Sequence, residues 1–133
     1  MSLESILLVD DDEIANRLHE RLIQKLKLSR NIFTKNNGKE ALDFVKQRYY
    51  SSRSLPSLIM LDLSMPVMDG VDFLKEICQS NLLYVNRIPV AILTNSAHPE
   101  DMKKVAAVRN CLYVTKPLDE EKLLQIIEHT MAY

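Results

Sequence analysis

The chain has 133 residues and a formal net charge of -1 at pH 7, with 47% apolar and 26% charged residues. These values are typical of one globular domain and exclude a disordered or fibrous chain. The charge gives no support for binding nucleic acid or an anionic membrane, and no stretch approaches the roughly 20 apolar residues of a membrane span. Residues 1–4 lack the features of a signal peptide, so we expect a cytoplasmic protein.

The first predicted elements are a strand and a helix. Ile6-Leu7-Leu8-Val9 is an apolar run that ends in Asp10, Asp11 and Asp12, which is typical of a strand buried on both faces of a parallel sheet. An amphipathic helix is predicted from about Glu13 to Leu28, with Asp12 as its cap. Its predicted inward residues are Ile14, Leu18, Leu22 and Leu26.

The second predicted strand and helix have shorter apolar patterns than the first pair. Ile32-Phe33-Thr34 predicts a strand, and Asn37-Gly38 predicts a turn before a helix. That helix is expected to fade into a surface loop over residues 50–54, and Pro56 keeps Leu55 out of helix. Its predicted inward residues are Ala41, Leu42, Val45 and Tyr49.

Three more pairs follow along the chain. Residues 58–62 form a second apolar run that ends in acid, followed by the turn-rich loop 65–70 and a helix over about 71–79. Residues 89–94 predict a strand, and Pro99 opens the next helix. The last strand is Leu112-Tyr113-Val114, before a helix capped by Asp119. The predicted inward residues of these last three helices are Leu74, Ile77, Met102, Val105, Ala106, Leu123, Leu124, Ile127 and Met131.

Five strand–helix pairs without repeats or linkers predict one domain over residues 1–133, with no effector domain. Right-handed crossovers make this alternation an α/β doubly wound, five-stranded parallel sheet, (βα)5 and flavodoxin-like, with strand order 2-1-3-4-5. Strands one and three are then neighbours, so Asp10, Asp11 and Asp62 are expected to meet at their carboxyl ends. Carboxylates so close repel unless a cation lies among them, and oxygen ligands suit Mg²⁺.

Two further strand ends carry polar groups, the hydroxyl of Thr94 and the amine of Lys116. With this set the chain resembles the receiver domain of two-component response regulators, in particular the stand-alone type of chemotaxis. The resemblance covers essentially the whole length. The matching segments are Val9–Asp12, Leu61–Gly70, Leu93-Thr94 and Tyr113–Pro117.

The resemblance implies a phosphorylation switch rather than an enzyme with a substrate of its own. Asp62 would accept a phosphoryl group from a histidine kinase or histidine phosphotransfer protein. Lys116 would bind the phosphoryl oxygens, and Thr94 would be the switch hydroxyl. The family also implies a cis bond between Lys116 and Pro117. Ser64 and Asn95 depart from the commonest family residues and bear on the lifetime of the phosphoryl group.

The resemblance also implies a metal site and an output surface. Asp10, Asp11, Asp62 and the backbone carbonyl of Ser64 would hold Mg²⁺ or Mn²⁺. The signal would leave through a contact with a downstream protein on the face of the fourth helix, fifth strand and fifth helix. The residues expected to be exposed on this face are Lys103, Lys104, Tyr113 and Ile126. For Ile126, partial burial against a neighbouring helix is an equal alternative.

Two other functions remain to be weighed. A haloacid-dehalogenase-like phosphatase also uses an aspartate nucleophile and Mg²⁺, but its second aspartate, the general acid, stands where this chain has Ser64. A receiver-like docking module that never takes phosphate would not need the intact set of acid, hydroxyl and lysine.

The remaining histidines and cysteines are expected to be structural. His19 and His129 are predicted to be solvated on helix surfaces, and His98 to lie in a surface loop. Cys78 and Cys111 lack metal-like spacing, so we expect buried, reduced thiols.

Overall fold

The computed structural model describes residues 2–95 and 99–132 of the chain. His98 therefore lies outside the described residues. The strands are β1 (Leu3–Val9), β2 (Ser29–Lys35), β3 (Leu58–Asp62), β4 (Val90–Thr94) and β5 (Leu112–Thr115). The helices are α1 (Glu13–Lys25), α2 (Gly38–Ser52), α3 (Gly70–Cys78), α4 (Pro99–Ala106) and α5 (Glu120–Met131), with a short 3-10 helix η1 (Val85–Arg87).

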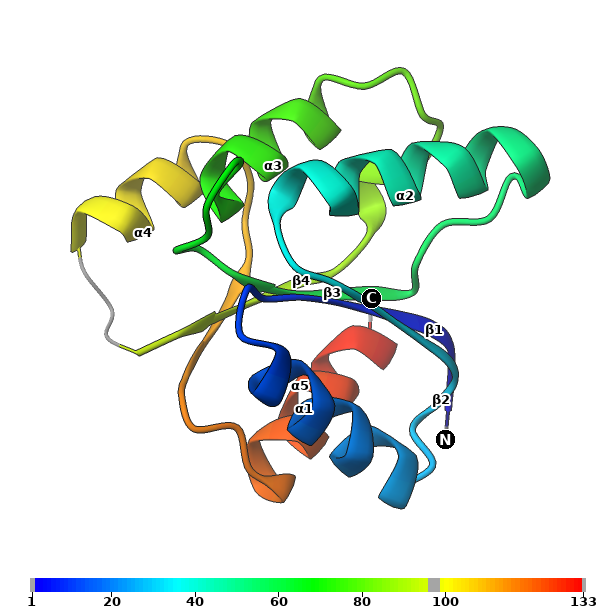
Figure 1. Cartoon of the computed structure of the whole chain (residues 1–133), viewed down its shortest axis with the longest axis vertical. Coiled ribbons are helices and arrows are strands. Elements are labelled where there is room, and N and C mark those ends of the chain that lie inside the picture. Colours follow the sequence, from blue (N-terminus) through cyan, green and yellow to red (C-terminus); the bar gives the residue numbers. More distant parts are fainter. Residues whose placement is uncertain (1, 96–98, 133) are drawn as a thin grey trace.

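All four strand pairs are parallel, and the sheet order is β2-β1-β3-β4-β5, which confirms the predicted fold. Helices α1 and α5 cover one face of the sheet, and α2, α3 and α4 cover the other (Figure 1). Both faces are therefore buried, which is why the strand sequences are continuously apolar rather than alternating.

Successive residues of the central strands point into two separate cores. Leu7 and Val9 of β1 pack with Phe73 and Val105 beneath α2, α3 and α4. Ile6 and Leu8 pack on the other face, in a core that also takes the inward residues of α5. Ile126 belongs to this second core and is fully buried, so of its two predicted alternatives burial holds.

The predicted orientation of α1 is wrong for its first half, whereas Leu22 and Leu26 further along are partly buried and pack against the second core, as predicted. Ile14 is 69% and Leu18 is 57% exposed, whereas Asn16, His19 and Ile23 are buried. The four-residue spacing used for the prediction turns each successive side chain about 40° past a full turn, so the line of apolar residues drifts around the helix. Packing against the sheet instead follows residues spaced by three and four.

Other differences lie at helix ends. Helix α2 continues to Ser52, so the predicted fading at residue 50 is wrong, and the left-handed Arg53 (φ 57°) ends it. Helix α1 stops at Lys25, before the left-handed Lys27 (φ 53°). Ala106 and Met131, predicted to point inward, are exposed. Cys78 and Cys111 are free thiols as predicted, but only half-buried.

The orientation of α1 can be tested with two isoleucines of the same helix. Ile23→Ala should lower the free energy of unfolding by about 2–4 kcal/mol, because it leaves a cavity in the core. Ile14→Ala should change it by less than about 0.5 kcal/mol, since that side chain is largely in solvent. Urea denaturation of both variants measures the difference. If Ile14→Ala lowered the free energy of unfolding more than Ile23→Ala does, the orientation predicted from the sequence would be the correct one.

Candidate functional site

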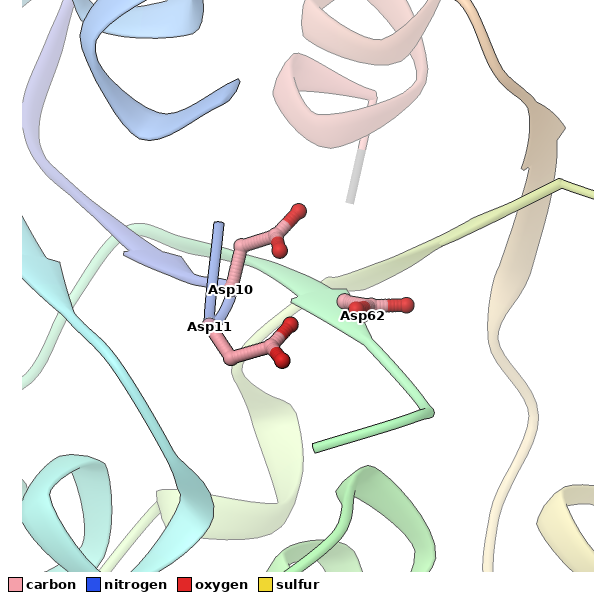
Figure 2. A group of neighbouring side chains, drawn as sticks. All are labelled: Asp10, Asp11 and Asp62. Carbon is pink, nitrogen blue, oxygen red and sulfur yellow. The ribbon is translucent and has the colours of Figure 1, made fainter. Parts of the chain in front are cut away.

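The acidic residues converge at the carboxyl ends of β1 and β3. Val9 and Leu61 are register partners in these neighbouring strands, and Asp10 and Asp62 come directly after them. One carboxylate oxygen from each of Asp10, Asp11 and Asp62 lies within 4.8 Å of the others (Figure 2). The structure thus brings together the three carboxylates that the sequence placed at the point where the winding of the sheet reverses.

Asp10 is the most buried of the three and has an ion pair with Lys116. Its side chain is 5% exposed, and the Lys116 ammonium lies 2.9 Å from Oδ2. The backbone N–H of Asp12 donates to the other oxygen of Asp10 (3.0 Å). Burial by itself lowers the pKa of Lys116, but the hydrogen bond and charge of Asp10 outweigh it, so that the pKa is raised. The lysine therefore stays charged in the site.

The ionised form of Asp62 is disfavoured in this cluster of charges. Burial raises the pKa of Asp62 to about 6, and the charge of Asp10 adds to the rise, while Lys116 and the backbone N–H of Ser64 oppose it. That N–H donates to Asp62 Oδ1 over 3.4 Å. The Asp62 carboxylate is thus destabilised when no cation is present, and a bound cation would favour its ionised form.

The loop after β3 is held by close backbone contacts at both glycines of the chain. A Cβ on Gly70 would lie 2.7 Å from the carbonyl oxygen of Asp62, and one on Gly38 would lie 2.7 Å from the carbonyl oxygen of Met68. The Gly70 N–H donates a hydrogen bond to the carbonyl of Leu63, and the Gly38 N–H donates one to the carbonyl of Met68 (both 2.9 Å). These contacts fix the loop that follows Asp62 and includes Ser64.

Thr94 and Lys116 lie at the carboxyl ends of β4 and β5. Thr94 is the last residue of β4 and is the register partner of Thr115 at the end of β5. The backbone N–H of Lys116 donates to the Thr94 carbonyl (2.7 Å), and the bond from Lys116 to Pro117 is cis, as the resemblance implied. Thr94 thus lies at the end of the strand beside β3, which carries Asp62, and Lys116 follows β5, one strand further out.

His19 is a neighbour of the site that the sequence did not predict. It is 9% exposed rather than solvated, and it lines a cavity of about 440 Å³ together with Asp12, Asn95 and Lys116. Burial lowers the pKa of His19; the charge of Asp10 opposes this and that of Lys116 adds to it. A prediction that turned the face with residues 16, 19 and 23 toward the sheet would have placed His19 here.

The donor set fits a hard divalent cation. Asp10, Asp11 and Asp62 supply carboxylate oxygens that lie close together. Mg²⁺ and Mn²⁺ prefer such oxygen ligands, and a divalent charge would relieve the repulsion among three carboxylates. The chemistry of these residues therefore suits a metal site of this class.

Among the described residues, none of the helices is long and apolar enough to cross a bilayer.

Comparison with known proteins gives the same picture over nearly the whole chain. Residues 6–128 match the response regulator receiver domain. The probable methanogenesis regulatory protein FilR2 of Methanothrix harundinacea is 34% identical, over 96% of this chain and 81% of its own. The response regulator Rcp1 of Synechocystis is 31% identical, over 92% of this chain and 83% of its own.

Solved structures agree with the sequence relatives. A two-component response regulator from Cytophaga hutchinsonii superimposes with a TM-score of 0.86 at 27% identity, with 100% of both chains covered. The phosphorylated cyanobacterial phytochrome response regulator RcpA gives 0.76 at 30% identity, covering 96% of this chain and 91% of its own. Together with the acidic cluster at the switch point, these matches establish that the chain belongs to the response regulator receiver domain family, the phosphorylation-activated switches of two-component signalling.

Proposed function

We propose that the chain accepts a phosphoryl group on Asp62 from a phosphohistidine of a histidine kinase or histidine phosphotransfer protein, with Mg²⁺, and passes the signal on through protein contacts. The observation that carries the proposal is the convergence of the Asp10, Asp11 and Asp62 carboxylates within 4.8 Å. The Lys116 ammonium beside them adds the positive charge that phosphoryl transfer needs.

Asp62 is the nucleophile in this proposal. An oxygen of its carboxylate attacks the phosphorus, and the bond from phosphorus to the imidazole nitrogen of the donor breaks. The electron pair of that bond stays on the imidazole. The attack requires an ionised carboxylate, so the pKa of Asp62, about 6 without a cation, makes cation binding favourable for the reaction.

Asp11, Asp10 and the Ser64 carbonyl would hold the metal with Asp62. When bound, Mg²⁺ neutralises charge on the phosphoryl oxygens and orients them for in-line transfer. The residues of the chain do the rest of the positioning. Asp10 keeps Lys116 charged at the edge of the site, at 2.9 Å, from where its flexible side chain can reach a phosphoryl oxygen.

Thr94 is the proposed switch residue. An acyl phosphate brings more negative charge than the carboxylate it replaces, and a hydroxyl donor at the end of β4 can meet that charge. In the neighbouring strand β5, two residues before the register partner of Thr94, the Tyr113 hydroxyl donates to the carbonyl of Met102 in α4 (3.4 Å). A shift of Thr94 toward Asp62 would change the packing around Tyr113 and so alter the contact between β5 and α4.

The exposed apolar residues of α1 support a protein as the phosphoryl donor. Ile14 and Leu18 line the same cavity as Lys116, together with Pro117 and Leu118. Their large exposure suits an apolar contact with a partner beside the site. Such a contact would place the phosphohistidine of the donor near Asp62, in the cytoplasm, where we expect the chain to work.

The proposed output surface is the face of α4, β5 and α5. Lys103 and Lys104 are exposed there, and Tyr113 is partly buried. A shallow cavity of about 360 Å³ lies between β5 and α5, lined by Tyr113, Lys122 and Gln125 among others. Ile126 is buried beneath it and so contributes shape rather than contact surface.

Ser64 argues against the phosphatase alternative. Its backbone N–H donates to Asp62, and its side chain has no group that titrates near neutral pH. Without an acid two residues after the nucleophile, the chain lacks the group that would drive turnover, and the phosphoryl group on Asp62 is retained as a signal.

The first functional test is Asp62→Asn. The amide keeps the shape of the side chain but is not a nucleophile, so incubation with acetyl phosphate and Mg²⁺ should add one phosphoryl group to the wild type and none to the variant. Intact-protein mass spectrometry measures the addition, and circular dichroism confirms that the variant is folded. Equal addition to both proteins would place the phosphoacceptor elsewhere.

The raised pKa of Asp62 predicts a pH-dependent stability without metal. Between the unfolded value of 3.8 and the folded value of about 6 the folded state binds more protons, so stability falls as pH rises through this window. Asp62→Asn removes this loss and should be more stable above pH 7, by about 1 kcal/mol after allowance for solvent screening. Below pH 4 the two proteins should differ least.

Urea denaturation in chelator from pH 3.5 to 8 measures this difference, with the exposed Glu128→Gln as control. Added Mg²⁺ should stabilise the wild type more than Asp62→Asn, because it offsets the same repulsion. A constant difference between the two proteins across the pH range would show that Asp62 is not the strained carboxylate.

Thr94→Ala tests the switch. The variant keeps the nucleophile and the metal ligands, so it should accept a phosphoryl group, but it lacks the hydroxyl donor. We expect smaller amide chemical-shift changes at α4 and Tyr113 when beryllofluoride, a mimic of the phosphoryl group, is added. Thr94→Ser, which keeps the hydroxyl, is the matched control. A full response in Thr94→Ala would assign the coupling to Lys116 or to the loop 65–70.

A further inference from the structure

A second cluster of exposed apolar side chains lies at the end of the sheet opposite the acidic site. Tyr50, Leu83 and Tyr84 are each about two-thirds exposed, at 65%, 65% and 64%. Tyr50 lies near the end of α2, which leads into the start of β3, and the other two lie in the loop that leads into β4. The amino ends of parallel strands share one edge, so these residues lie away from Asp62. Figure 1 shows the loop between α3 and β4 beside α2.

Contacts between side chains and backbone join these residues into one surface, which we call the tyrosine patch: Tyr49, Tyr50, Arg53, Leu83, Tyr84 and Arg87. The buried Tyr49 hydroxyl accepts a hydrogen bond from the Leu83 N–H (3.2 Å). The rings of Tyr49 and Tyr50 are 5.5 Å apart. The guanidinium of Arg53 lies 4.8 Å from the Tyr49 ring, and that of Arg87 lies 4.9 Å from the Tyr84 ring.

The loop of the tyrosine patch is held in place while its apolar side chains point outward. Leu82, Val85 and Ile88 are buried and anchor the loop in the core. Between them Tyr84 has left-handed backbone (φ 67°), which is unfavourable for an aromatic residue. Strain of this kind is retained where the surrounding structure enforces it, often at binding surfaces. A rigid loop also loses little entropy when a partner binds.

The charged residues in the two segments that form the tyrosine patch are all basic. Residues 44–57 and 79–89 contain Lys46, Arg48, Arg53 and Arg87, and neither segment contains an aspartate or glutamate. The chain as a whole has a net charge of -1, so the basic character is local. A partner that buries the apolar side chains would need acidic groups at the positions of Arg53 and Arg87.

We infer that the tyrosine patch is a second docking surface, for an acidic protein segment that carries apolar side chains. A symmetric contact between two copies would bring the same arginines face to face, so like charges disfavour self-association. Single-stranded nucleic acid would stack its bases on the tyrosine rings, but Arg87 already covers a face of Tyr84. Because the surface is remote from Asp62, a partner bound here would leave the acidic site open.

The test uses the full chain and a synthetic glutamate-rich helical peptide with leucine and phenylalanine on one face. Amide chemical shifts should change at residues 46–53 and 80–88, and binding should weaken as salt is raised. A peptide with lysine in place of glutamate should not bind. Shift changes centred on α1 or on the face of α4, β5 and α5, or equal binding of the lysine peptide, would overturn the inference.

Substitutions separate the apolar and charged contributions. Tyr84→Asn removes the ring and tolerates the left-handed backbone, and the double variant Arg53→Gln, Arg87→Gln removes the charges. Each should weaken binding about tenfold or more, as loss of a central contact does. Met131→Ser and Arg21→Gln remove an exposed apolar side chain and an exposed arginine elsewhere and should leave the affinity unchanged. Unaltered affinity in the patch variants would overturn the inference.

Two further measurements address other occupants. Sedimentation of the wild type should give a monomer whose behaviour does not change in Tyr84→Asn; a dimer that this substitution dissolves would replace the acidic partner by a second copy. Oligo-dT should leave the amide shifts of residues 46–53 and 80–88 unchanged. Binding of the oligonucleotide there, abolished by the double arginine variant, would replace the acidic partner by nucleic acid.

Discussion

Mutual repulsion among three carboxylates is the constraint on which the site depends. Asp10, Asp11 and Asp62 meet because β1 and β3 are neighbours in the sheet, and the ion pair from Lys116 to Asp10 offsets part of their charge. Burial of Asp62, and after it the charge of Asp10, raises the pKa of Asp62. The apolar cores on both faces of the sheet supply the stability that holds such an unfavourable cluster together, and the cluster in turn favours any species that brings positive charge.

The polar residues that α1 turns toward the sheet belong to the surroundings of the acidic site. The Asn16 amide donates to the backbone carbonyls of Asp10 (3.0 Å) and Lys35 (3.4 Å) and so joins the ends of β1 and β2. His19 lies one turn further along, facing the charges of Asp10 and Lys116. A helix that only covered the sheet would bury leucines at these positions. The departure from simple amphipathic pattern marks the part of the helix that lies beside the acidic site.

The two ends of the sheet have different physical character. At the carboxyl ends, carboxylates and Lys116 form a charged site flanked by the exposed Ile14 and Leu18. At the amino ends, arginines and tyrosines form the tyrosine patch, with no carboxylate in either segment that builds it. Because strands separate the two surfaces, partners at both could bind at the same time. The receiver fold thus offers room for a contact that is independent of phosphoryl transfer.

The sequence by itself determined the five strands, their order and the cluster of Asp10, Asp11 and Asp62. Apolar runs ending in Asp10 and Asp62, the caps Asp12 and Asp119, and Thr94 and Lys116 at later strand ends are local signals, and the rules of parallel sheets bring them together.

Tertiary structure alone decided which side of α1 faces the sheet, that Lys116 pairs with Asp10, and that the loop of Leu83 and Tyr84 is bonded to Tyr49. These features depend on contacts between residues far apart in the chain, such as the pair 106 positions apart that links Asp10 to Lys116. The periodicity of one segment carries no information about the packing and charge that other segments contribute.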